Sequence, residues 1–211
     1  AYNDWLSQEI LTVDPSRLIG LAAMPALSVE ASIAEMERCL KLGFKGVWLN
    51  AMPSVGSAIR PEDDPFWAAA QANGVAIHFH VRIMRALAKP KPKGARGDDL
   101  IGLASVGAAN MIVDMGEIIQ SGVHDRFPKL KWVMVEAGSG WIPYILEQLD
   151  DRWWRNRHWL PTKLQHEPSF YYRRNWKSAL MVDRYAVKNR HALGVDNLLW
   201  SSDYPHHGCD W

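Results

Sequence analysis

The sequence has little cysteine, no excess of charge and no long apolar run, and each absence excludes a class of protein. Two cysteines, Cys39 and Cys209, occur among 211 residues, so we expect no disulfide framework and a reducing, cytoplasmic compartment. Lysine and arginine number 24 against 23 acidic residues, which gives no electrostatic case for binding nucleic acid or an anionic membrane. No apolar stretch reaches the ~18 residues of a spanning helix, and no basic segment followed by an apolar one opens the chain.

Short apolar runs alternate along the chain with segments of helical periodicity. Such alternation predicts a parallel sheet covered by helices, in one domain over residues 1–211. Six strands are expected, either as a doubly wound sheet or as a (β/α)8 barrel that lacks its ends. No Gly-x-Gly-x-x-Gly pattern follows the first strand, so a nucleotide-binding doubly wound sheet gains no support. The expected strands are 18–23, 47–49, 75–81, 132–136, 177–182 and 198–202, and the expected helices are 28–43, 63–72, 106–121, 140–157 and 184–193.

Polar residues stand where several expected strands end, which is where barrels place their chemistry. His78 and His80 are two apart on one strand, so both side chains point to the same face. An imidazole pair at a barrel mouth suits a divalent metal such as zinc. The alternative is a buried structural histidine beside a surface one, and the spacing alone leaves both possibilities open.

Two carboxylates occupy comparable positions. Glu136 ends the strand at 132–136 and precedes a glycine-rich turn, so it could be a metal ligand, a general base or a salt-bridge partner. Asp203 follows the last strand; a carboxylate there is costly unless it is paired or metal-bound, although Asp also caps turns before proline. His206 and His207 come next and could support the site or be solvated loop residues.

Other candidates are arginines and tryptophans. Arg82 follows the histidine strand and could meet an anionic substrate, although such arginines are more often solvated. Trp153, Trp154 and Trp159 lie on or after a long charged helix and predict either an interface or packing of that helix on its own barrel.

Several segments resemble the amidohydrolase-related family of metal-dependent TIM barrels. This family includes aminocarboxymuconate semialdehyde decarboxylase and the resorcylate-type decarboxylases. The resemblance covers nearly the whole chain and implies that strands three to eight of the barrel are present. The matching segments are 17–22 with Pro25, 42–47, 76–81, 127–131 and, most specifically, Ser202-Asp203-Tyr204-Pro205-His206.

The resemblance implies roles for individual residues. His80 would be a metal ligand, Asp203 a metal ligand and proton acceptor, and His78, Arg82 and His206 groups that support the site or meet the substrate. The family's first-strand His-x-His pair has no counterpart here, so we expect this chain to bind its divalent metal, zinc by preference, weakly or not at all. Glu136 stands where many members have a catalytic histidine, and this leaves hydrolysis and decarboxylation of a small aromatic or carboxylated substrate both open.

Two further interpretations remain open. One is a metal-free glycosidase-type barrel that uses Glu136 and Asp203 as its carboxylate pair. The other is a catalytically incomplete fragment, since strands one and two and the final helix of the family pattern are missing. A barrel without two strands has open sheet edges, which predicts self-association into a homo-oligomer, most simply a dimer.

Overall fold

One curved parallel sheet organises the molecule. The computed structural model describes residues 1–56, 58–80 and 100–206, without the side chains of 100–107. Its six strands are all parallel, and each pairs with the next in chain order. This confirms the predicted six-stranded barrel order. The strands are β1 (Leu21–Ala23), β2 (Gly46–Leu49), β3 (Ala76–Phe79), β4 (Lys131–Met134), β5 (Trp176–Leu180) and β6 (Leu198–Trp200).

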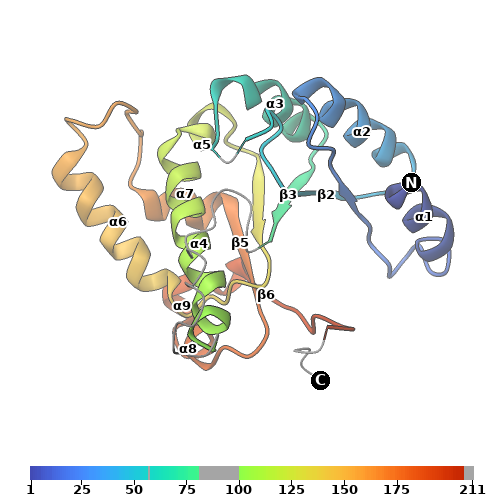
Figure 1. The fold of residues 1–211 in the computed structure, drawn as a ribbon. Coiled ribbons are helices and arrows are strands. Elements are labelled where there is room, and N and C mark those ends of the chain that lie inside the picture. The colour runs from blue at the N-terminus through green and yellow to red at the C-terminus, as the bar shows by residue number, and fades with distance from the viewer. Residues whose placement is uncertain (57, 81–99, 207–211) are drawn as a thin grey trace, which may run out of the picture.

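Helices lie on the outer side of this arc (Figure 1). The predicted helices are present, but the expected helix at 184–193 is split in two at Asn189. None of the described helices is both long enough and apolar enough to cross a membrane. The helices are α1 (Tyr2–Trp5), α2 (Val29–Lys41), α3 (Asp64–Ala72), α4 (Leu100–Gln120), α5 (Val123–Arg126), α6 (Ile142–Asn156), α7 (Pro168–Asn175), α8 (Arg184–Lys188) and α9 (Arg190–Leu193), with short turns of helix η1 (Leu6–Ile10), η2 (Pro61–Asp63) and η3 (Val195–Asn197).

The core lies between the sheet and the helices. Ile77 and Phe79 alternate with the more exposed residues of β3 and are fully buried on the helix side. On the next two strands Trp132 and Trp176 are also fully buried, with ring centroids 5.6 Å apart in a stacked arrangement. Aromatic burial of this kind stabilises the packing of the helices on the sheet.

The opposite, inner face of the sheet is partly open to solvent. On β2, Val47 and Leu49 are buried toward the helices, whereas Trp48 between them is 38% exposed. Leu199 on β6 is likewise 42% exposed. Six strands form an arc that does not close, so the inner face borders the open side between α1 and the chain after β6 (Figure 1).

The free edge at β1 is partly covered by a side chain. The Ala23 N–H donates to Asn3 Oδ1, and Asn3 Nδ2 donates to the Ala23 carbonyl, both at 2.9 Å. Because an unpaired backbone group is costly when buried, Asn3 supplies at this residue the pairing that a neighbouring strand would provide.

Candidate metal and active site

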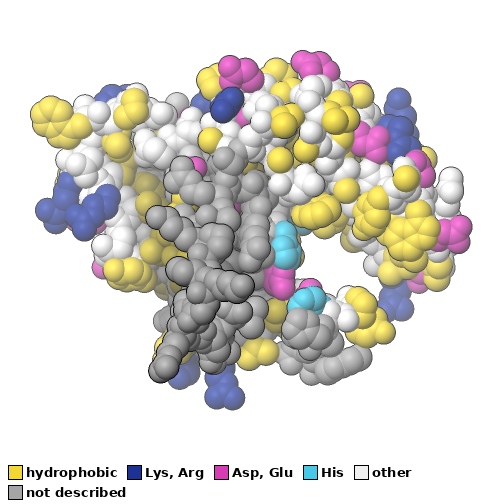
Figure 2. All heavy atoms as spheres, in the orientation of Figure 1, with side chains coloured by type: hydrophobic (Ala, Val, Ile, Leu, Met, Phe, Trp, Pro, Cys, Tyr) yellow, Lys and Arg dark blue, Asp and Glu magenta, His cyan; other side chains and the backbone are white. Residues whose placement is uncertain are grey.

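Four polar side chains meet at the carboxyl edge of the sheet. His80 follows β3, Glu136 follows β4, and Asp203 and His206 follow β6. The Val135 N–H donates to the Phe79 carbonyl at 3.0 Å, so pairing continues past the end of β4 and sets Glu136 beside His80. In the space-filling view, histidine and acidic side chains gather beside an opening in the molecule (Figure 2).

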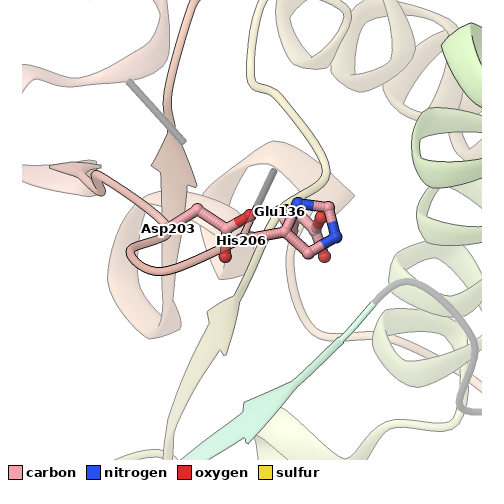
Figure 3. A group of neighbouring side chains, drawn as sticks. All are labelled: Glu136, Asp203 and His206. Atoms are coloured by element: carbon pink, nitrogen blue, oxygen red, sulfur yellow. Dashed lines mark ion pairs between the residues drawn. The ribbon is translucent and has the colours of Figure 1, made fainter. Parts of the chain in front are cut away.

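The side chains contact one another directly. His80 Nε2 forms an ion pair with Glu136 Oε2. His206 Nδ1 lies 3.4 Å from Asp203 Oδ2, and potential ligand atoms of Glu136, Asp203 and His206 all lie within 4.8 Å of one another (Figure 3). The structure therefore brings together four residues that the sequence singled out. Their roles as ligands or catalysts stay predictions.

Backbone conformation contributes to this arrangement. Glu136 has φ 63° and Asp203 has φ 58°, in the left-handed region that side chains with a Cβ disfavour. Among the described residues one other non-glycine position, Val55, shares this feature, and it lies in the loop after β2. Such conformations persist where surrounding contacts hold them, and they concentrate at functional sites.

The segment after β6 is folded back by its own hydrogen bonds. The Asp203 N–H donates to Ser201 Oγ at 3.2 Å, and the His206 N–H donates to the Asp203 carbonyl at 2.8 Å. This turn returns the His206 ring to the Asp203 carboxylate. Sequence spacing alone left His206 as either a supporting or a solvated residue, and its side chain is 49% exposed.

His78 lies outside this cluster. Its Nδ1 is 3.3 Å from the Val47 carbonyl oxygen, and its ring packs so closely on Gly46 that an added Cβ there would lie 2.8 Å from His78 Cε1. Burial lowers the pKa of the His78 imidazole, which favours its neutral form. Arg82 and His207 fall outside the described residues.

Asp183 is a residue that the sequence analysis did not single out. Its carboxylate accepts hydrogen bonds from the backbone of Ser139 and Gly140, in the turn that begins at Glu136. These contacts join residues 43 and 44 positions apart, and no local pattern signals a contact over that distance.

The donor set fits a divalent metal ion. Carboxylate oxygens and imidazole nitrogens are ligands that zinc and manganese accept. Asp203 Oδ2 is buried and has no hydrogen-bond partner within the described part of the chain, although His206 lies within ion-pair range. A buried oxygen of this kind has capacity for a further electropositive partner. Glu136, Asp203 and His206, with His80 on Glu136, are the residues that could hold it.

Curated relatives of this chain are decarboxylases. Gamma-resorcylate decarboxylase of Polaromonas is 28% identical over 232 residues, covering 99% of this chain and 67% of that protein. The 2-amino-3-carboxymuconate-6-semialdehyde decarboxylase of Dictyostelium discoideum is 25% identical, over 96% of this chain and 55% of that protein. The chain thus spans between about half and two thirds of the length of these relatives.

Solved structures share the fold. Dihydroxybenzoic acid decarboxylase from Polaromonas, crystallised with manganese and the inhibitor 2-nitroresorcinol, superposes with a TM-score of 0.76 at 24% identity, over 97% of this chain and 63% of that one. The apo form of IDCase from Metarhizium anisopliae gives a TM-score of 0.78 at 17% identity, over 99% of this chain and 58% of that one. At these identities the match supports the barrel fold alone.

A family model described as amidohydrolase matches residues 1–210, which is nearly the whole chain. This agrees with the resemblance seen in the sequence motifs and with the parallel strand order of the sheet. The chain therefore belongs to the amidohydrolase family.

Proposed function

We propose that the protein of which this chain is part removes carbon dioxide from a small aromatic carboxylic acid, with the help of a divalent metal. The observation that carries the proposal is the meeting of Glu136, Asp203 and His206 donor atoms within 4.8 Å at the carboxyl edge of the sheet. Decarboxylation is favoured over hydrolysis because three curated relatives that match 96% or more of the chain are named decarboxylases.

The metal would be held by Asp203, His206 and Glu136, together with His80. Two relatives were crystallised with manganese, and zinc suits the same ligands, so both metals belong in the test. A bound divalent metal supplies positive charge that orients the oxygen atoms of the substrate and stabilises negative charge during the reaction.

The chain's own acidic groups supply the proton chemistry. In decarboxylation the bond between ring carbon and carboxyl carbon breaks, its electron pair stays on the ring carbon, and a proton must be delivered there. The ion-paired His80 and Glu136 hold one proton between them, and Asp203 is the other carboxyl group among the described residues of the site that can carry one. His80 orients Glu136 through their ion pair, and the turn at 203–206 orients Asp203. In hydrolysis, Asp203 would instead accept a proton from the attacking water.

The metal-free glycosidase alternative uses the same two carboxylates. It gains nothing from the imidazoles of His80 and His206, each of which contacts one of those carboxylates. Membership of the amidohydrolase family also weighs against it. The remaining alternative, a catalytically incomplete fragment, is decided by experiment.

The test is turnover of 2,6-dihydroxybenzoate to resorcinol and carbon dioxide in the presence of added Mn²⁺ or Zn²⁺. Formation of resorcinol is measured by chromatography. We expect metal-dependent product that is lost in Asp203→Asn, since Asn tolerates the left-handed backbone at this position. The matched control is Asp151→Asn, an exposed carboxylate paired with Arg155 on α6, which should retain activity. Turnover that continues after chelation, or in Asp203→Asn, would contradict the proposal.

A further inference from the structure

The turn between β4 and α6 leaves the strand in an unusual way. Glu136 and Gly138 both adopt left-handed backbone conformations, each with φ 63°, before α6 begins at Ile142. Two left-handed residues within three positions reverse the chain sharply. The direction of the Glu136 carboxylate therefore depends on what holds this turn in place.

One carboxylate holds the turn. Asp183 Oδ2 accepts hydrogen bonds from the N–H groups of Ser139 and Gly140, both at 2.7 Å. Asp183 Oδ1 accepts from the Ala186 N–H at 2.9 Å and so caps the start of α8. A single side chain after β5 thus ties the turn after β4 to the neighbouring helix, with bonds that the negative charge strengthens.

The Asp183 carboxylate lies so close to two glycines of the turn that a side chain there would contact it. A Cβ on Gly140 would lie 2.7 Å from Asp183 Oδ1 and 2.9 Å from Tyr185 Cβ. A Cβ on Gly138 would lie 3.3 Å from Asp183 Oδ2, in addition to the strain of its positive φ. The Gly-x-Gly spacing after Glu136 therefore records the close approach of Asp183 as well as a sharp turn.

We propose that Asp183 is a positioning residue, which fixes the Glu136 carboxylate against His80 and toward Asp203 without touching the substrate. This rests on the proposed function. Its bonds hold the far end of a turn whose first residue is Glu136, in a conformation that its own Cβ disfavours. A competing role is purely structural, as the cap of α8 alone.

Two substitutions separate these roles. Asp183→Ser keeps a capping oxygen for α8 but is too short to reach the β4–α6 turn, and Asp183→Asn keeps one acceptor oxygen without the charge. The control is Asn197→Ala, because Asn197 Nδ2 donates to the carbonyls of Tyr172, Arg173 and Trp176 at the opposite, amino edge of the sheet. It should lower the melting temperature without reaching the site.

The first readout is Mn²⁺ affinity of the folded full chain, measured by titration. We expect Asp183→Ser to weaken Mn²⁺ binding about tenfold or more, as the loss of groups that orient metal ligands commonly does. Asp183→Asn should weaken it less, and Asn197→Ala should leave it within about twofold of wild type. Wild-type Mn²⁺ affinity in Asp183→Ser, with affinity lost in Glu136→Ala, would overturn the proposal.

The second readout needs no metal. The side-chain ¹⁵N resonances of His80 at fixed pH report its contact with Glu136. We expect Asp183→Ser to move them toward their positions in Glu136→Ala, and Asn197→Ala to leave them unchanged. If the wild-type chain binds no Mn²⁺, the metal site of the proposed function is refuted for this chain. The His80 resonances then test the positioning role of Asp183 by themselves. Unchanged His80 resonances in Asp183→Ser would then overturn the positioning role.

Discussion

His124 is buried in the aromatic layer beneath the sheet and makes the stability of the fold depend on pH. It is 1% exposed, its Nε2 accepts a hydrogen bond from Trp176 Nε1 at 2.8 Å, and its ring stacks on Trp176 with centroids 5.7 Å apart. Burial lowers the pKa of the imidazole to about 3, and the nearby charges of Arg174 and Arg126 act in the same direction. Folded His124 is therefore neutral throughout the pH range 5 to 7.

The sign of the pH effect follows from the unfolded chain, in which a histidine has a pKa of about 6.5. Below that pH the unfolded chain binds a proton on His124, whereas the folded chain does not. The contribution of His124 to stability is thus complete above pH 6.5 and is lost progressively as the pH falls toward 3. With a limiting slope of about 1.4 kcal/mol per pH unit below pH 6.5, the loss between pH 7 and 5 is about 2 kcal/mol.

The assay is urea unfolding followed by tryptophan fluorescence at several pH values between 5 and 7. We expect His124→Gln, which keeps an acceptor for Trp176 but cannot take up the proton, to have a free energy of unfolding about 2 kcal/mol less pH-dependent than wild type. His191→Gln removes an exposed histidine and should keep the wild-type dependence. Equal pH dependence in wild type and His124→Gln would refute the reasoning.

Three further predictions concern the turn, the metal and assembly. Gly140→Ala should lower the free energy of unfolding by about 1–3 kcal/mol, since its Cβ would meet Asp183; Gly56→Ala, with no atom within 4 Å, should cost far less, and equal urea midpoints would contradict this. After dialysis against a mild chelator, elemental analysis should find no stoichiometric metal, because the first-strand His-x-His pair of the family has no counterpart in this chain. Retained metal would mean that His80, Glu136, Asp203 and His206 alone are sufficient to bind it tightly. Light scattering should show a dimer, and Trp153→Ala with Trp154→Ala should shift it toward monomer, because Trp154 is 63% exposed; a wild-type monomer would exclude this assembly.

Most strands were predictable because they are local apolar runs between turn residues, whereas β5 is interrupted by Lys177 and Ser178 and gives a weaker signal. Helix α7 was not, since it is only eight residues long and its position depends on distant partners. The Ser169 N–H donates to Asp150 Oδ1 at 2.8 Å, and Tyr171 Oη donates to Asp125 Oδ1 at 2.6 Å. Contacts over 19 and 46 residues leave no periodicity in the sequence.

The candidate site was predictable to the extent that parallel strands end at one edge. That rule alone places His80, Glu136 and Asp203 near one another. It does not predict that His80 pairs with Glu136, or that His206 turns back to Asp203. Those pairings depend on turns whose backbone angles are set by tertiary contacts rather than by residue type alone.

The side-chain amide of Asn3 makes the β1 edge of the sheet less available for pairing with a strand of another chain. Its two hydrogen bonds to the Ala23 backbone come from a residue only 20 positions away along the chain. Asn3 therefore competes with any incoming strand for the same backbone groups, and it does so at high effective concentration because it is part of the same chain. A strand that pairs with β1 must displace the Asn3 side chain. The free energy of strand binding is then reduced by the free energy of the hydrogen bonds that Asn3 loses. Strand addition at β1 therefore costs the two hydrogen bonds of Asn3 in addition to the ordering of the incoming chain.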